Sequence, residues 1–398
     1  MQKTRDFTRR SALGSAAAAI LAPAIPGAAG AATRGVTDTE VAIGMMTDLS
    51  GVTAVQGSNA ANSIRMAFDE VNARGGISGR KIHFIVEDDE YLVPKAVQAM
   101  NKLINRDDIF ICVGSGGTPH MDAVLPTMLE KQVPNIFPLT CARSMFEPFS
   151  KYKFGQFSSY YDQMRAAVKY FAERLGKQRF GAMYQDTDFG KDVFAGVAAQ
   201  TAAMGMKLAG VTAHRPTDTD FNAPLTRLRD AGCDMIMAGT IVKDTTIILQ
   251  TARKMGWDVQ FCGTFASYST AVAEAPGEPA DGFYSMSPAL YRYADDTRPA
   301  VRAFFGKYRA AYGIDPNYLG EAGYTQALFV IDVLTKVGRD LTLDSFLTAM
   351  DSMTDWHDIF DGPRLSLSPT NHHASSQSFL SVVKKTRWTP VLEDALSF

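Results

Sequence analysis

The sequence lacks the features that indicate a disulfide scaffold, a membrane protein or a metalloenzyme. Its 398 residues include only four cysteines. They are widely separated and are expected to be buried thiols: Cys112, Cys141, Cys233 and Cys262. Beyond residue 32, no run approaches the ~18 consecutive apolar residues that a membrane-spanning helix needs. The six histidines are dispersed and lack the spacing of metal ligands. We therefore expect no metal site.

A surplus of basic charge is also missing. The formal net charge is -2, which does not favour nucleic acid or an anionic membrane as a partner. Nucleotide and hydrolase motifs are incomplete as well. The glycine-rich loop Gly114–His120 has Pro119 where the third glycine of a dinucleotide fingerprint belongs, and it has no P-loop lysine. Ser115 does not lie in a G-x-S-x-G elbow. The sequence thus predicts no cofactor and disfavours an exported enzyme.

The first 32 residues have the composition of an export signal. Basic residues precede an apolar stretch at 12–25, and small residues follow at 27–32. The paired Arg9 and Arg10 resemble a twin-arginine signal, and a general secretory signal is the alternative. We expect residues 1–32 to be removed and the mature protein to be periplasmic.

The remainder of the chain alternates apolar strands with amphipathic helices. This order predicts an α/β fold in which helices flank parallel sheets. The expected strands are Val41–Met46, Lys81–Glu87, Phe110–Val113, Asn135–Leu139, Arg179–Gln185, Lys207–Ala213, Met235–Ala238 and Gln260–Thr264. A chain of this length exceeds what one core usually supports, so two Rossmann-like lobes are expected.

Changes of composition suggest three crossings between the lobes. They fall near residues 152–161, 282–288 and 361–369. Three crossings form a three-strand hinge and allow each lobe to be completed by a returning segment. The predicted lobes are 36–155 with 286–358, and 156–285 with 359–398.

The loop Gly114–His120 follows a predicted strand and precedes a predicted helix. At such a position, backbone N–H groups attract an anion. Gly116 and Gly117 allow close approach, and Ser115 and Thr118 add hydroxyl donors. A carboxylate is the natural occupant. The alternative is a tight glycine turn whose hydroxyl residue only caps the helix.

A second loop of the same kind is Pro138–Ser144. Its Thr140 and the amides of Cys141 and Ala142 would face the same crevice as Ser115 if the two strands are neighbours. Polar groups that converge from two strand ends make a pocket. An ordinary helix cap is the alternative for this loop.

Four motifs resemble the leucine/isoleucine/valine-binding family of periplasmic solute-binding proteins, which deliver small molecules to ABC transporters. They are "VAIGMMTDLSG" (41–51), "VNARGGISGRKI" (71–82), "DDEYLVPKAV" (88–97) and "DFGKDV" (188–193). The resemblance implies the type I periplasmic binding protein fold, ligand capture by hinge closure, a permease as partner, and a monomer.

The resemblance also implies particular site residues. The ligand carboxylate would be held by Ser115–Thr118 and Thr140–Ala142, and Phe189 would close over the ligand side chain. Further candidates are Gln56, Tyr160, Thr240, Phe265 and Tyr268.

One position departs from the family. Relatives that bind α-amino acids present a glutamate to the ligand ammonium, whereas this chain has Thr264 and Phe265 there, and Glu274 is expected to be too distant. A buried ammonium without a partner costs several kcal/mol. The sequence therefore predicts an aromatic or branched aliphatic acid as ligand. A branched-chain amino acid is the alternative, and a ligand sensor of the same fold is another.

Overall fold

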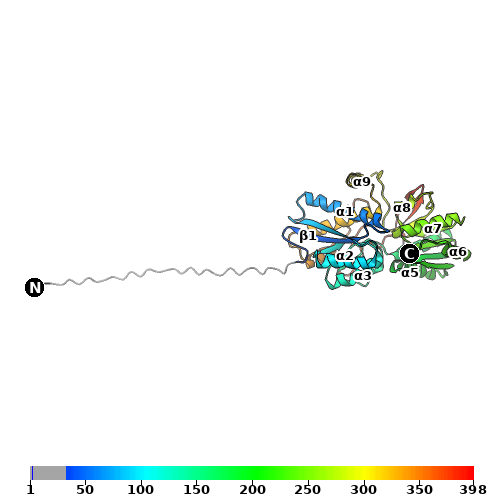
Figure 1. Ribbon diagram of the computed structural model, residues 1–398, viewed down its shortest axis with the longest axis horizontal. Helices are drawn as coiled ribbons and strands as arrows, with labels where there is room; N and C mark the ends of the chain where they lie inside the picture. Colours follow the sequence, from blue (N-terminus) through cyan, green and yellow to red (C-terminus); the bar gives the residue numbers. More distant parts are fainter. Residues whose placement is uncertain (1, 3–32) are drawn as a thin grey trace. The chain divides into compact units, whose positions relative to one another are not determined.

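The computed structural model describes residue 2 and residues 33–398, so the predicted export signal lies outside the described part except for Gln2. Two β-sheets, each accompanied by helices, organise residues 33–398 (Figure 1). The first sheet is wholly parallel, with strand order β2-β1-β3-β4-β5. Its strands are β1 (Glu40–Thr47), β2 (Lys81–Asp88), β3 (Ile111–Val113), β4 (Asn135–Ile136) and β5 (Lys153–Phe154).

Helices from both ends of the described chain accompany the first sheet. They are α1 (Ala54–Ala73), α2 (Val93–Asn105), α3 (Thr118–Glu130), α9 (Pro299–Tyr312), α10 (Tyr318–Val337) and α11 (Leu343–Asp351). Figure 1 shows α9 beside α1, and the Tyr312 hydroxyl donates to the Asn62 carbonyl across them at 3.0 Å. Helix α10 packs so closely on α1 that a Cβ at Gly323 would lie 2.7 Å from the Ala60 carbonyl oxygen.

The second sheet has the order β12-β11-β10-β9-β8-β6-β7. Its strands are β6 (Phe180–Gln185), β7 (Gly210–His214), β8 (Met235–Gly239), β9 (Gln260–Gly263), β10 (Tyr284–Ser287), β11 (Phe379–Lys384) and β12 (Arg387–Pro390). The helices in this part of the chain are α4 (Tyr160–Leu175), α5 (Asp188–Ala203), α6 (Asn222–Asp230), α7 (Val242–Lys254) and α8 (Thr270–Ala273). Short 3₁₀ turns occur at η1 (Arg143–Met145) and η2 (Phe265–Ser267).

The predicted α/β class is confirmed, and all eight predicted strands are present. The predicted parallel sheets are confirmed as the main pairing, and in the second sheet β11 adds antiparallel pairs with both β10 and β12. Lys385 and Thr386 join β11 to β12 with φ values of 47° and 63°. Two central residues with positive φ define a type I′ hairpin, which usually contains Asn-Gly. Because Lys-Thr stands in place of that pair, this hairpin is not recognisable from the residues of its turn.

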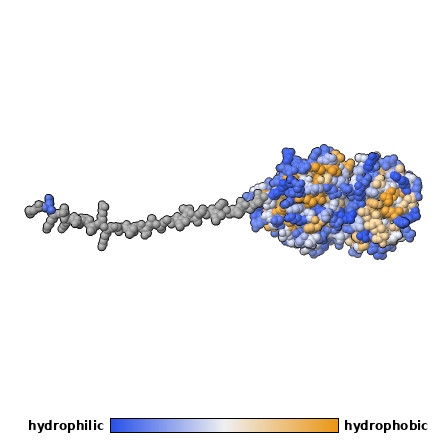
Figure 2. All heavy atoms as spheres, turned by 90° about the horizontal axis from the view of Figure 1, so that it is seen from below, coloured by the Kyte–Doolittle hydropathy of each residue, from blue (hydrophilic) through white to orange (hydrophobic). Residues whose placement is uncertain are grey.

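The core consists of apolar side chains from the strands and the inner faces of the helices. All four cysteines are buried free thiols, as predicted. On the face shown in Figure 2, hydrophobic and hydrophilic residues are interspersed, as on ordinary protein surfaces. Among residues 33–398, no helix has the length and apolar character that a bilayer span requires.

The three predicted crossing segments meet around a small internal cavity. It offers about 30 Å³ to the centres of water molecules and is lined by Gln156 and Phe157, by residues 288–290, and by residues from 358 to 365. Glu321 on α10 also lines this cavity and is only 3% exposed. Burial raises the pKa of Glu321 well above its ordinary value of 4.5. The neutral acid is therefore the form that this part of the fold accommodates.

Because the Glu321 carboxyl is buried, we expect the stability of the protein to fall as the pH rises. A carboxyl whose pKa is higher in the folded than in the unfolded state stabilises the fold below its unfolded pKa, and that contribution is lost as pH passes through the folded pKa. Glu321→Gln keeps a neutral side chain at every pH. We expect its melting temperature to exceed that of the wild type increasingly from pH 5 upward. Thermal unfolding across a pH series measures this, with the exposed Glu274→Gln as the matched control. A constant difference between Glu321→Gln and wild type would contradict the prediction.

Candidate ligand-binding site

The main cavity lies at the carboxyl ends of strands from both sheets. Its volume, measured as the space that the centres of water molecules can occupy, is about 90 Å³. Since one water needs roughly 10–15 Å³ by that measure, the cavity has room for a small organic molecule. Groups that follow β1, β2, β3 and β4 form one wall, and groups that follow β6, β8 and β9 form the other. This is the position at which open α/β sheets bind ligands.

The polar wall is built from the two loops that the sequence singled out. Strands β3 and β4 are hydrogen-bonded neighbours, so the loops after them meet at one edge of the sheet. Thr118 Oγ1 and Thr140 Oγ1 share a hydrogen bond of 2.5 Å. That bond uses one of the two hydroxyl protons, which leaves one proton for another acceptor. Gly117 precedes α3 with φ 83°, and no side chain caps the N–H groups of this helix.

The opposite wall is aromatic. Tyr160 at the start of α4 and Phe189 in the first turn of α5 pack edge to face, with ring centroids 4.9 Å apart. Phe265 and Tyr268 follow β9 and also line the cavity. The Tyr268 hydroxyl is engaged elsewhere, because it contacts Ser381 Oγ at 3.0 Å and accepts the Tyr291 N–H at 2.9 Å. This wall therefore presents mainly apolar ring surface.

The cavity brings together most of the residues predicted from the sequence. The predicted residues that line it are Gln56, Gly116, Gly117, Thr118, Thr140, Tyr160, Phe189, Phe265 and Tyr268. The sequence also predicted that Glu274 is too distant. The structure places Glu274 at the exposed end of α8, away from the lining.

Four predicted residues lie outside this lining. Ser115 is fully buried, and its hydroxyl accepts the Met46 N–H at 2.8 Å, which ties the loop to β1. The Thr240 hydroxyl is bonded to that of Thr245 at 2.7 Å. Cys141 is buried behind the loop, and Ala142 lines a neighbouring groove. Neighbouring residues on one loop point to different sides, and sequence order alone does not resolve this.

Several lining residues were missed, above all Asp48, Asp89, Tyr91 and Asn317. In the sequence alone, the acidic cluster after β2 is typical of a strand end and helix cap. Its backbone has an unusual course, because Glu90 and Tyr91 have φ values of 53° and 54°, which non-glycine residues seldom adopt. That turn follows Asp89 and brings the chain past the cavity. The signal in the sequence was the position of Asp48 and Asp89 directly after strands.

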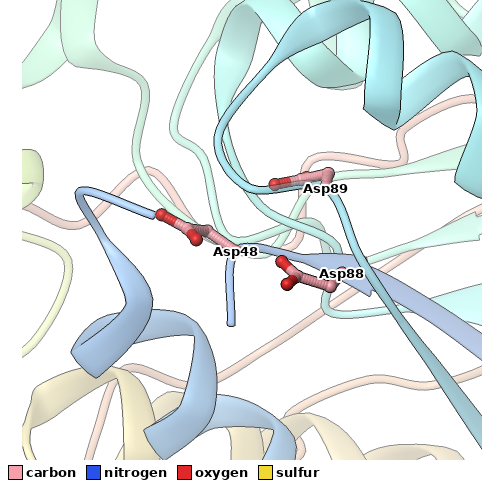
Figure 3. Close-up of side chains that lie close together, drawn as sticks. All are labelled: Asp48, Asp88 and Asp89. Atoms are coloured by element: carbon pink, nitrogen blue, oxygen red, sulfur yellow. The ribbon is translucent and has the colours of Figure 1, made fainter. Parts of the chain in front are cut away.

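Three carboxyl groups, those of Asp48, Asp88 and Asp89, lie close together beside the cavity (Figure 3). Asp48 accepts the N–H groups of Ser50, Gly51 and Thr53 and the Thr53 hydroxyl. Asp88 accepts the N–H groups of Leu49 and Glu90 and the Ser50 hydroxyl. These donors already use the oxygens of Asp48 and Asp88, and Ca²⁺ takes 6–8 oxygen ligands. The cluster is a hydrogen-bonded loop support.

An ion pair connects the two walls beside the cavity. Arg143, in the loop after β4, donates from Nε to Asp192 Oδ1 on α5 at 2.7 Å. Its guanidinium also lies over the Tyr161 ring of α4, 4.1 Å from the centroid. Burial raises the pKa of Asp192, and the bond from Arg143 opposes that rise. Arg143 thus joins the elements of the first sheet to helices of the second.

Two mainly parallel sheets that share a cavity at their strand ends define a two-lobed small-molecule-binding protein. Comparison with known proteins identifies the family. The periplasmic binding protein family matches residues 40–387, and the chain belongs to it. The members of this family bind small molecules for transport and are not enzymes. The protein is a substrate-binding protein of an ABC transporter.

The names of similar proteins specify several different ligands. The leucine-, isoleucine-, valine-, threonine- and alanine-binding protein of Pseudomonas aeruginosa is 22% identical over 72% of this chain and 76% of its own length. Two solved structures share the fold. The fatty acid ABC transporter substrate-binding protein from Thermomonospora curvata has a TM-score of 0.83 at 22% identity and covers 92% of this chain and 94% of its own. The branched-chain amino acid transporter protein LivJ from Streptococcus pneumoniae, in complex with isoleucine, has a TM-score of 0.77 at 19% identity, over 90% and 100%.

Proposed function

We propose that this protein captures a small carboxylate with an aromatic or branched aliphatic body in the periplasm and presents it to an ABC permease. The observation that carries the proposal is the asymmetry of the cavity. Hydroxyl groups and a helix N-terminus lie on one wall, and the rings of Phe189, Phe265 and Tyr268 lie on the other. An acid with an apolar body is complementary to both walls.

A third group supports an anionic or acceptor group on the ligand. Asn317 caps α10, and its Oδ1 accepts the Gly320 N–H at 3.1 Å. The amide nitrogen of the same side chain, Nδ2, takes no part in this bond and has no hydrogen-bond partner among residues 33–398. Asn317 lines the cavity and is 6% exposed. A carboxylate oxygen would satisfy this buried donor.

The proposed mechanism is hinge closure between lobes at 36–155 with 286–358, and 156–285 with 359–398. The ligand first docks on the loops of Thr118 and Thr140, and the aromatic wall then closes over it. Because the cavity has groups from both walls, a bound ligand contacts both lobes only when they are closed. This difference in contacts shifts the equilibrium toward the closed form, which the permease would receive.

A branched-chain amino acid is the second candidate ligand. The named ligands of relatives favour it. The position at which such receptors place a glutamate is occupied here by Thr264 and Phe265, both buried, and Phe265 lines the cavity with its ring. Any partner for an ammonium must therefore come from elsewhere in the cavity.

The carboxylate is the part of the proposal that can be tested directly. We expect aromatic and branched aliphatic acids, such as phenylacetate, phenylpropanoate and 4-methylpentanoate, to raise the melting temperature by several degrees at millimolar concentration. Ligands that bind only the folded state stabilise it in proportion to the logarithm of concentration over Kd. A thermal-shift panel that includes leucine and valine measures the response.

The matched controls are the primary amides of the same acids. They keep the apolar body and remove the charge, so they are expected to give little or no shift. Equal shifts from acid and amide, or no shift from any acid, would contradict a carboxylate ligand.

A further inference from the structure

Asp89 places an unsatisfied carboxylate oxygen at the cavity. Its side chain is completely buried and it lines the cavity. Oδ1 accepts the Tyr91 N–H at 2.9 Å, whereas Oδ2 has no hydrogen-bond partner among residues 33–398. A buried polar atom left without a partner is costly, and a carboxylate oxygen more so than a neutral one. The geometry therefore lacks a donor at this point.

The surrounding protein does not supply that donor. The nearest charged groups are Asp48 and Asp88, which are themselves acceptors, and their own donors come from the backbone and from Ser50 and Thr53. Asp89 is the member of this group that borders the cavity with an oxygen still free. Because Asp89 lines the cavity, a ligand bound there is the remaining source of a donor.

We infer that the ligand carries a hydrogen-bond donor, a hydroxyl or an ammonium group, which Asp89 accepts. The inference rests on the proposed function, because it adds this donor to the carboxylate proposed there. The ligand class becomes a hydroxy acid or an amino acid with an apolar body. Asp89 would then determine specificity, since it distinguishes these molecules from plain acids of the same shape.

The electrostatics of the site agree with this assignment. Burial, together with the charges of Asp48 and Asp88, raises the pKa of Asp89 to about 7. A donor on the ligand favours the ionised carboxylate, whereas a plain acid brings no partner for it. With this assignment, Phe265 at the family's glutamate position no longer argues against a ligand that carries an ammonium. An ammonium held by Asp89 on the first wall does not need a carboxylate from the second.

The test uses two sets of three ligands that differ only in one substituent. One set is 4-methylpentanoate, 2-hydroxy-4-methylpentanoate and leucine, and the other is phenylpropanoate, phenyllactate and phenylalanine. Titration calorimetry on the full mature protein would give Kd for each. We expect at least one donor-bearing acid to bind tenfold or more tightly than its plain counterpart. A tighter hydroxy acid identifies a hydroxyl donor, and a tighter amino acid identifies an ammonium.

Asp89→Asn is the decisive variant. Its amide oxygen can still accept the Tyr91 N–H, while the amide nitrogen replaces the free oxygen. The preference for donor-bearing acids is expected to fall to less than about threefold. Glu87→Gln changes the charge by the same amount two residues away, at a side chain that pairs with Lys102 and does not line the cavity, and should keep the preference. Melting temperatures of the free variants verify that both are folded.

The outcomes separate this inference from the proposed function. If acids bind but the plain acids match their hydroxy and amino counterparts, or if Asp89→Asn retains the preference, the inference is overturned and the proposed function stands. If none of the acids binds, the proposed function fails and the inference fails with it. If Asp89→Asn does not fold, the order of the Kd values that the wild type shows within each ligand set still decides whether the ligand carries a donor.

Discussion

Thr118→Val combined with Thr140→Val is expected to weaken ligand binding by at least tenfold, with little change in the melting temperature of the free protein. The two hydroxyls bond to each other, and one proton remains for the ligand. A hydrogen bond to a charged group contributes about 1.5–3 kcal/mol, which corresponds to roughly tenfold or more in Kd. Replacing both partners of a buried hydrogen bond by apolar groups of the same shape is nearly neutral for stability.

The chain offers a matched pair for this experiment. Thr240 and Thr245 also share a buried hydroxyl bond, at 2.7 Å, but neither lines the cavity. Thr240→Val with Thr245→Val should leave Kd within about twofold of the wild type. Titration calorimetry with the best acid from the ligand panel gives both values. Unchanged affinity in the Thr118 and Thr140 variant would remove their loops from the site.

Arg143→Met is expected to weaken ligand binding by about tenfold because it destabilises the closed form. The side chain of Asp192 is 10% exposed and that of Arg143 is 36% exposed. Solvent therefore partly screens this ion pair, and breaking it costs less free energy than breaking a fully buried pair. In the closed arrangement, loss of Arg143 leaves the Asp192 carboxylate with its main partner removed. In an open arrangement, water would solvate both groups. The substitution therefore disfavours closure and should increase the dissociation rate of the ligand.

A second arginine provides the control for Arg143. Arg387 pairs with Asp295 at 2.8 Å and lies 4.1 Å from the Tyr293 ring centroid, so it makes the same two kinds of contact. Both partners of that pair are exposed, and it does not join the two walls. Arg387→Met should leave the dissociation rate unchanged in stopped-flow measurements. Asp192→Asn added to Arg143→Met should recover part of the loss, because it removes the unpaired charge. Equal rates for Arg143→Met and wild type would exclude a role in closure.

The regular parts of the fold followed from local patterns. Each predicted strand appears within a few residues of its expected position, because runs of buried β-branched and apolar residues indicate parallel strands regardless of the rest of the chain. The missed elements are of another kind. Strands β5, β10, β11 and β12 were not predicted. Strand β5 has only two residues and pairs with β4, which has two of the five residues predicted for it, and strands this short depend on pairing with a neighbouring strand.

The site was predicted in part for the same reason. Glycines and hydroxyl residues after a strand indicate a loop at the sheet edge, so Gly117, Thr118 and Thr140 were recognised as candidates. Which side of the loop each residue faces was not recognisable. Ser115 and Thr118 are three residues apart, yet one bonds to β1 and the other lines the cavity. Asn317 lies far from both in the sequence and reaches the cavity through the packing of α10 on α1.

The sequence by itself determined the α/β class, the strand-end loops and, through its motifs, the resemblance to periplasmic receptors. These depend on patterns of adjacent residues, which act through local backbone preferences and the period of side-chain burial. Only the tertiary structure decided that Asp89 and Asn317 border the cavity and that Ser115 and Thr240 do not. Their roles depend on which partners distant segments supply to each polar atom, and a buried polar atom is free for a ligand only when the folded chain leaves it unbonded.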